Sequence, residues 1–324
     1  MEKLTKKQQI IKLKEGDFVD DIFVIKIKKS MIPYANGYSF ALILSDSSGA
    51  SIEYKYWGGT DENKVRKLFL SIKSDSVVRV AGKINSYNGK LQISGDEFTI
   101  LNVLNPGEYD AEFISPPQRN PEEMYSMLLS KINSVFNIEI KNLLLKIFEG
   151  DLKEKFLIHP GAIQIHHNWK SGLLQHVLEI IEYCETSVSL FKGLDRDLLI
   201  AGAVLHDIGK LEEIEVTSRI KGTQKGQLIS HLVLGTNYVS EKLKQSNISE
   251  IIKDKLMHMI VSHHGKTELG SPKPPMFPEA LVLYYADEMS SKVSEMIEFI
   301  KEARKNTEDD FMYDSKKGTN IFLR

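Results

Sequence analysis

The sequence predicts two domains of different class, a small β-barrel domain followed by an all-helical domain. Residues 1–110 contain short runs in which polar and apolar side chains alternate, which is the period of half-buried strands. Residues 122–324 instead place apolar side chains at helical spacing. The segment 105–121 between them carries four prolines and little periodicity, and we assign 111–121 as the linker. The expected fold is therefore multidomain, with separate β and α parts.

The first half contains five expected strands and one expected helix. The strand runs cover 17–31, 38–45, 50–57, 76–86 and 90–101, and the helix covers 62–72. Asn88-Gly89 separates the last two strands and is the strongest short hairpin signal. Three strands, a helix and two strands is the order of the OB-fold, a Greek-key barrel that binds oligonucleotides. The same half holds 16 Lys and Arg residues against 14 Asp and Glu residues, which weakly favours an anionic partner.

The composition is that of an ordinary globular protein. Hydrophobic residues make up 42% and charged residues 27%, which excludes collagen-like, disordered and disulfide-scaffold classes. The net charge of −2 argues against coating nucleic acid by bulk charge. Cys184 is the single cysteine, which excludes an internal disulfide and favours a reducing compartment. The N-terminus is charged and no apolar run reaches about 18 residues, so we expect a cytoplasmic protein with no membrane partner.

The helical half holds every histidine and two carboxylates in apolar surroundings. His206-Asp207 stands in the run LLIAGAVLHDIGK, and Asp287 stands in ALVLYYADEM. A buried carboxylate needs a partner, either a metal ion or a Lys or Arg. Adjacent helical residues point about 100° apart, so His206 and Asp207 reach one ion only near a helix end, which Gly209 supplies. Imidazole with carboxylate suits Mn, Fe, Zn, Co or Ni better than Ca.

The order His176, His206-Asp207, Asp287 resembles the H…HD…D signature of the HD-domain metal-dependent phosphohydrolases. One branch, the YhaM-type 3′→5′ exoribonucleases, is similar over nearly the whole chain, through IHHNWKSGLLQHVLEI, DLLIAGAVLHDIGK, GQLISHLVLG and MIVSHHGKTELGSPKPPMFPEALVLYYADEMSSKV. This resemblance implies an OB-fold joined to an HD domain that hydrolyses single-stranded RNA to nucleoside 5′-monophosphates, with single-stranded DNA as a side substrate. It implies one or two divalent ions, Mn²⁺ first, with Fe, Co or Mg as alternatives.

The resemblance also implies a role for individual residues. The ligands of a first metal would be His176, His206, Asp207 and Asp287. A second metal would be held by His231, His263 and His264, with Asp207 bridging the two ions. Lys210 would contact phosphate and take part in catalysis with Asp207, and the pocket would include His166, His167, Glu268 and Ser271. Three residues depart from the family pattern: Ser171 and Ser230 stand where glycine is frequent, and Ser290 stands where an aspartate is common, which questions the support of Asp287.

Residues for nucleic-acid binding are expected on the strands of the first domain. Bases would stack on some of the aromatic residues Tyr38, Phe40, Tyr54, Tyr56 and Trp57, while Lys55, Arg79, Lys83 and Lys90 would follow the phosphates. The alternative is that about half of these aromatic residues belong to the barrel core. Strand alternation alone does not say which half.

Two other function classes compete with the exoribonuclease. The first is an HD nucleotidase or cyclic-nucleotide phosphodiesterase that acts on a small molecule, and a domain that binds oligonucleotides argues against it. The second is a single-strand binding protein with an inactive HD domain, and the complete set of ligands argues against it. The sequence leaves the oligomeric state open, with a homo-oligomer among the alternatives.

Overall fold

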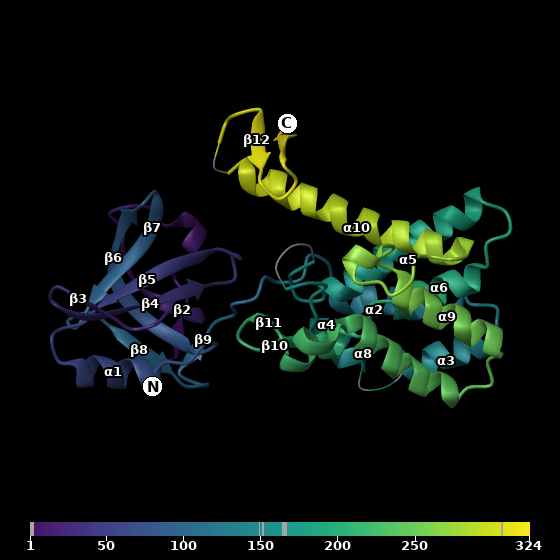
Figure 1. Cartoon of the computed structure of the whole chain (residues 1–324), viewed down its shortest axis with the longest axis horizontal. Coiled ribbons are helices and arrows are strands. Elements are labelled where there is room, and N and C mark those ends of the chain that lie inside the picture. Colours follow the sequence, from purple (N-terminus) through teal and green to yellow (C-terminus); the bar gives the residue numbers. More distant parts are fainter. Residues whose placement is uncertain (1–2, 149, 151, 164–166, 306) are drawn as a thin grey trace. The chain divides into compact units, whose positions relative to one another are not determined.

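The computed structural model describes residues 3–148, 150, 152–163, 167–305 and 307–324, and the chain divides into two compact units (Figure 1). The first unit comprises 1–116 together with 216–220, and the second comprises 117–215 and 221–324. The division after Pro116 falls within the segment assigned as the linker.

The first unit is built on a mixed seven-stranded sheet. The strands are β2 (Phe18–Lys28), β3 (Ile32–Tyr34), β4 (Gly37–Ser45), β5 (Ser51–Trp57), β6 (Val77–Tyr87), β7 (Lys90–Asp96) and β8 (Leu101–Leu104). They follow the order β2-β4-β5-β7-β6-β8, with β3 on β4, and only β5 and β7 pair in parallel. β2 also pairs with β6, and its ladder with β4 shifts register between Ile25 and Ile27. Such a bulge bends the strand locally and increases its twist.

Most predicted elements of this unit are confirmed, including the helix α1 (Glu62–Ser71), whose N-terminus is capped by Asp61. The single strand expected over 90–101 is wrong, because β7 ends at Asp96 and a turn precedes β8. Asp96 itself makes that turn, since its carboxylate accepts from the backbone N–H of Phe98. Four short elements were not predicted: β1 (Leu4–Thr5), β3, β9 (Tyr109–Asp110) and the 3₁₀ turn η1 (Ile10–Lys12). Each is too short to show a period.

The second unit is a helical bundle around one apolar core. Its helices are α2 (Pro121–Asn133), α3 (Ile138–Phe148), α4 (Leu152–Ile158), α5 (Gly172–Leu190), α6 (Arg196–Leu205), α7 (Lys210–Glu213), α8 (Gln224–Lys244), α9 (Glu250–Ser262) and α10 (Pro278–Ala303), with the 3₁₀ turn η2 (Thr267–Leu269). Leu198 to Leu205 of α6 are all buried, which puts this helix at the centre of the core. Within the described part of the chain, no helix combines the length and apolarity needed to cross a membrane.

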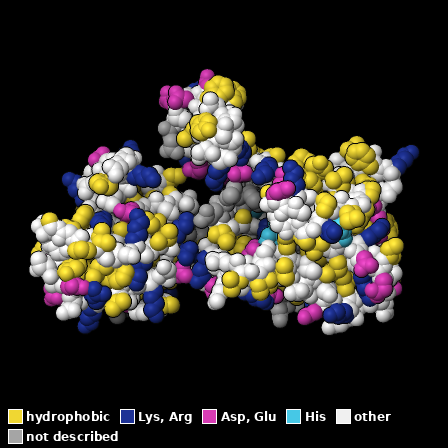
Figure 2. Space-filling view, in the orientation of Figure 1, with side chains coloured by type: hydrophobic (Ala, Val, Ile, Leu, Met, Phe, Trp, Pro, Cys, Tyr) yellow, Lys and Arg dark blue, Asp and Glu magenta, His cyan; other side chains and the backbone are white. Residues whose placement is uncertain are grey.

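Two short hairpins interrupt the helical half and were not predicted, namely β10 (Ile214–Val216) with β11 (Ile220–Gly222), and β12 (Phe311–Asp314) with β13 (Thr319–Phe322). The second hairpin packs on the end of α10, where Ala303, Ile321 and Leu323 form a small separate core. Its outer face carries exposed aromatic side chains, which Figure 2 shows as yellow atoms at the surface. The main core of the unit contacts only the first half of α10, which carries Asp287.

Candidate metal centre

Three helices and the ends of two others bring all seven predicted ligands to one place. His176 comes from α5, His231 from α8 and Asp287 from α10, while the others follow helix ends: His206 and Asp207 after α6, His263 and His264 after α9. His176, His206 and His263 are fully buried, and little histidine surface is visible in the space-filling view (Figure 2). The expectation that His206 and Asp207 lie at a helix end is confirmed, since α6 ends at Leu205. The expectation that Gly209 supplies that end is wrong, because Gly209 precedes the first residue of α7.

The carboxylate of Asp207 lies at the middle of this group. Its Oδ2 lies 3.5 Å from Nε2 of His176 and 3.3 Å from Nε2 of His206. Its Oδ1 lies 3.6 Å from Nε2 of His231 and 3.6 Å from Nε2 of His263. The two oxygens of one buried carboxylate therefore face two different sets of imidazoles.

Two further charged side chains, Asp287 and Lys210, lie near Oδ2 of Asp207 or near the His176 ring beside it. Oδ1 of Asp287 lies 3.2 Å from Nε2 of His176. Nζ of Lys210, three residues after Asp207, lies 2.6 Å from Oδ2 of Asp207. Burial lowers the pKa of His176, but its contacts with Asp207 and Asp287 outweigh that effect and raise the pKa to about 9. Lys210 is held in its charged form, because attraction by Asp207 and Asp287 outweighs burial and raises its pKa.

Helix ends fix the ring orientation of three histidines. Nδ1 of His206 donates to the carbonyl of Ala203 at 2.8 Å, and Nδ1 of His263 donates to the carbonyl of Ile260 at 2.8 Å. These carbonyls belong to last turns, where helices leave acceptors without helical partners. Nδ1 of His264 donates to the carbonyl of Leu269 in η2 at 3.0 Å. Each ring thus carries its hydrogen on Nδ1 and turns the lone pair of Nε2 toward the centre.

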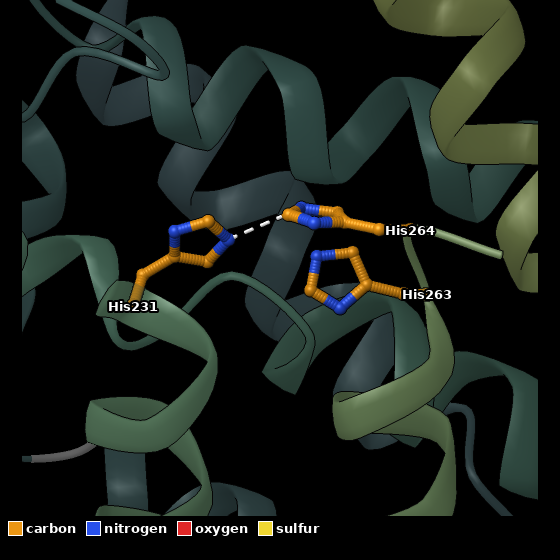
Figure 3. Close-up of side chains that lie close together, drawn as sticks. All are labelled: His231, His263 and His264. Carbon is orange, nitrogen blue, oxygen red and sulfur yellow. Dashed lines mark hydrogen bonds between the residues drawn. The ribbon is translucent and has the colours of Figure 1, made fainter. Parts of the chain in front are cut away.

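The paired Nε2 atoms of His231 and His264 lie 3.3 Å apart, and Figure 3 shows the two rings pointing toward each other beside His263. Nδ1 of His231 lies 2.9 Å from Oε2 of Glu213, a group that only accepts. If His231 carries its hydrogen on the Nδ1 that faces Glu213, both Nε2 atoms are acceptors, and their contact then needs a proton or a cation between them. Burial and the neighbouring imidazoles lower the pKa of His264 to about 4, which disfavours the proton.

Buried polar atoms in the centre support the same interpretation. Nε2 of His206, Nε2 of His263 and Oδ1 of Asp207 are buried and have no hydrogen-bond partner among the described residues. Buried polar atoms of folded proteins are almost always paired, so three orphaned acceptors around one point require an explanation. Ligand atoms of His176, His206 and Asp207 lie within 4.8 Å of one another, as do those of His231, His263 and His264. The donor set fits divalent metal ions on both sides of Asp207.

The comparisons with known proteins agree with this geometry. The model of the HD domain matches residues 173–292, which contain all seven candidate ligands. The protein named 3′-5′ exoribonuclease YhaM from Geobacillus sp. (strain WCH70) is 34% identical to this chain over 295 residues, covering 88% of this chain and 86% of the relative. The chain belongs to the YhaM family. It is accordingly a phosphodiester hydrolase of the HD type.

The serines that depart from the YhaM pattern occupy informative positions. Ser171 and Ser230 both have positive φ, 63° and 74°, which is the backbone region where glycine is favoured. Ser290 supports His176 rather than Asp287: its Oγ lies 3.0 Å from Nδ1 of His176 and donates to Oε2 of Glu179 at 2.7 Å. Asp287 is instead supported by Ser291, whose Oγ lies 3.4 Å from Oδ1 of Asp287.

The expected pocket residues of this YhaM-family chain differ in burial, and one of them is not described by the structure. His166 lies outside the described residues. His167 is buried, with Nε2 3.1 Å from Oε2 of Glu179. Ser271 is buried and Glu268 is exposed in η2, the turn that supports His264 through Leu269.

Glu179 and Glu213 were missed by the sequence analysis. Glu213 contacts His231, whereas Glu179 contacts His167 and Ser290, the serine beside His176. Their spacing offered a signal, because Glu179 follows His176 by three residues and Glu213 follows Lys210 by three, which puts each pair on one helix face.

The expected nucleic-acid residues of the first unit need correction. Phe40, Tyr54 and Tyr56 are buried in the core of the sheet, so their rings are not accessible to bases. Tyr38 is partly buried against the same core. Arg79 binds Asp20 through two hydrogen bonds of 2.7 and 2.8 Å, which neutralises its charge. The residues that remain available are Lys55, Trp57, Lys83 and Lys90.

Proposed function

We propose that this protein is a metal-dependent 3′→5′ exoribonuclease that hydrolyses single-stranded RNA to nucleoside 5′-monophosphates. The observation that carries the proposal is the position of Asp207, whose two oxygens face two sets of imidazoles. Membership of the YhaM family supports the direction of attack and the substrate, because the relative from Geobacillus is named a 3′-5′ exoribonuclease. Single-stranded DNA is a candidate side substrate.

The residues divide into two ligand sets that share Asp207. The first set is His176, His206, Asp207 and Asp287; the second is Asp207, His231, His263 and His264. When bound, divalent metal supplies Lewis acidity, which lowers the pKa of a coordinated water and neutralises the anionic phosphate. Mn²⁺ suits the mixture of imidazole and carboxylate, with Fe, Co and Mg as alternatives.

The chain's own groups bind and orient the substrate. Lys210 is charged, and its Nζ lies beside Asp207, where it can hold a phosphate oxygen of the scissile linkage. The rings fixed through Nδ1 keep their Nε2 atoms in place before substrate arrives, so little reorganisation accompanies the reaction. We assign Glu268, Ser271, His166 and His167 to the walls of the pocket.

We also propose that the first unit, residues 1–110, is an OB-fold that holds single-stranded RNA, joined through 111–121 to the HD domain of residues 122–324. The pairing of β2 with both β4 and β6 supports a barrel, as does the parallel pair β5–β7. Lys55 and Trp57 alternate with the buried Tyr54 and Tyr56, and therefore lie on the outer face of β5. Nζ of Lys55 lies 5.0 Å from the centre of the Trp57 ring, which makes a surface suited to a base and its phosphate.

The test is the product of digestion. RNA with an unpaired 3′ end and a 5′ label should shorten one nucleotide at a time in Mn²⁺, releasing nucleoside 5′-monophosphates, and should stay intact in EDTA. Free nucleotides and cyclic nucleotides, supplied at the same concentration, should be poor substrates. Loss of the 5′ label as the first product, or preferred hydrolysis of the small molecules, would contradict the proposal.

A further inference from the structure

Two carboxylates lie behind the ligand histidines, one on each side of Asp207. Glu179 is on α5 and Glu213 ends α7. Neither belongs to the ligand sets proposed above, and each reaches a different ligand histidine. Both are partly buried, which strengthens their hydrogen bonds relative to exposed ones.

Glu179 acts on His176 through a serine. The hydroxyl of Ser290 donates its hydrogen to Oε2 of Glu179 at 2.7 Å, since a carboxylate only accepts. The lone pairs of the same hydroxyl are then left to accept from Nδ1 of His176 at 3.0 Å. In this order of donors, Nδ1 of His176 donates to Ser290, and Nε2 is the ring nitrogen that lies beside Asp207 and Asp287. The other oxygen of Glu179 accepts from Gln175 at 3.0 Å, which holds the carboxylate in place.

Glu213 acts on His231 directly and at two points. Its Oε2 lies 2.9 Å from Nδ1 of His231, and its Oε1 accepts from the backbone N–H of the same residue at 2.9 Å. The preceding residue, Ser230, has φ 74° and ψ 149°, a conformation that side chains other than glycine strongly disfavour. One carboxylate thus holds both the ring and the backbone of a histidine that follows a strained residue.

Contacts with His159 and with α8 fix the backbone of Glu213. Nε2 of the buried His159 contacts the carbonyls of Lys210 and Ile214 at 3.2 and 3.1 Å, which secures both ends of α7. A Cβ atom at Gly226 would lie 2.5 Å from the carbonyl oxygen of Glu213, so α8 packs directly on this residue. These contacts fix the backbone from which the side chain of Glu213 reaches His231.

We propose that Glu179 and Glu213 are positioning residues that set the metal affinity of the two halves of the centre separately. Glu179, through Ser290, serves the half that contains His176, and Glu213 serves the half that contains His231. This inference rests on the two-ion centre of the proposed function. Removing such a partner of a metal ligand lowers metal affinity by about 10- to 100-fold.

The experiment titrates the full chain with Mn²⁺ and measures free Mn²⁺ by electron paramagnetic resonance, with no substrate present. Glu179→Gln and Glu213→Gln should each weaken one of two binding events by about 10- to 100-fold and leave the other within about threefold. The matched controls are Glu182→Gln and Glu212→Gln, whose side chains form surface ion pairs with Lys131 and Lys225. Both controls should bind Mn²⁺ as the unaltered protein does.

The two halves are told apart by removing one of them. In Asp287→Ala protein, which keeps the His231 half, Glu213→Gln should weaken the remaining ion and Glu179→Gln should not. In His264→Ala protein, which keeps the His176 half, Glu179→Gln should weaken binding of the remaining ion and Glu213→Gln should not. If the unaltered protein binds fewer than two ions, the two-ion centre of the proposed function fails. If it binds two and both carboxylate variants weaken both ions equally, or neither, the present inference fails.

A rescue variant separates positioning from a general loss of structure. In Glu179→Gln protein, the further change Ser290→Asp places a carboxylate directly beside Nδ1 of His176. We expect this double variant to recover most of the lost Mn²⁺ affinity. A melting temperature unchanged in Glu179→Gln, together with no recovery in the double variant, would contradict a role through His176.

Discussion

Gly209 packs so closely on His231 that a Cβ atom at position 209 would lie 2.0 Å from the carbonyl oxygen of His231. The glycine therefore permits α7 and α8 to approach each other, and it joins the turn that carries Asp207 to the strained start of the His231 segment. Its φ of −64° is ordinary, so the absence of a side chain, and not backbone freedom, is what the site requires.

Gly209→Ala should reduce both stability and activity. Forcing an extra methyl into a packed contact costs about 1–3 kcal/mol, and here the displaced backbone carries a ligand. Thermal melting and hydrolysis of a 3′-tailed RNA would measure the two effects. Gly150→Ala is the control for introducing a side chain, since no atom lies within 4 Å of a Cβ atom there and its φ is not positive. Normal melting and normal activity in Gly209→Ala would contradict this account of the contact.

Asp207→Ala should lower hydrolysis below about a hundredth of the unaltered rate, because one carboxylate serves both ligand sets. Binding of single-stranded RNA, measured by fluorescence anisotropy, should change little, since that binding is assigned to the first unit. Activity well above this level would show that Asp207 does not join the two halves.

Divalent metal should stabilise the folded protein. An ion that binds the folded state at 100 times its dissociation constant adds about 2.7 kcal/mol, so Mn²⁺ should raise the melting temperature by several degrees over EDTA-treated protein. Ca²⁺ prefers oxygen ligands and should raise it much less. Equal shifts with both ions would indicate that the imidazoles are not the ligands.

Trp57→Ala should weaken binding of single-stranded RNA without unfolding the first unit. A base stacked on an aromatic ring contributes about 1–3 kcal/mol, and the Trp57 side chain is exposed. Tyr54→Ala should behave in the opposite way, with a lower melting temperature, because Tyr54 is fully buried. Phe136→Ala, which removes an exposed ring of the second unit, is the control for both.

Digestion should stop near a stable duplex. Unpairing costs about 1.4 kcal/mol per base-pair step, and the sequence contains no G-x-x-x-x-G-K-[ST] loop for a nucleotide-driven motor. A hairpin with a 3′ tail should be trimmed to the duplex and then persist on a sequencing gel, and a hairpin with a blunt 3′ end should resist. Passage through a strong hairpin without delay would contradict this prediction.

The long elements were predictable because each shows a local period, whereas the candidate ligands were assigned because their motifs resemble those of a known family. Alternation located β4 and β5, and the apolar run around His206-Asp207 located the centre. Alternation did not decide which of Tyr54 and Trp57 faces solvent, because both are aromatic and only the register of β5 separates them. The roles of Glu179 and Glu213 depend on contacts 111 residues apart, as between Glu179 and Ser290, or on the backbone of a strained turn. Such contacts have no local period.

The rings of His206 and His263 take their orientation from the carbonyls of Ala203 and Ile260, and a carbonyl is supplied by every amino acid. Positions 203 and 260 can therefore change identity during evolution, within the limits of core packing, without disturbing the ligands that they hold. A catalogue of essential side chains would omit both positions. The centre is in this sense partly encoded by where two helices end, and lengthening either helix by one turn would do more harm than most point mutations near it.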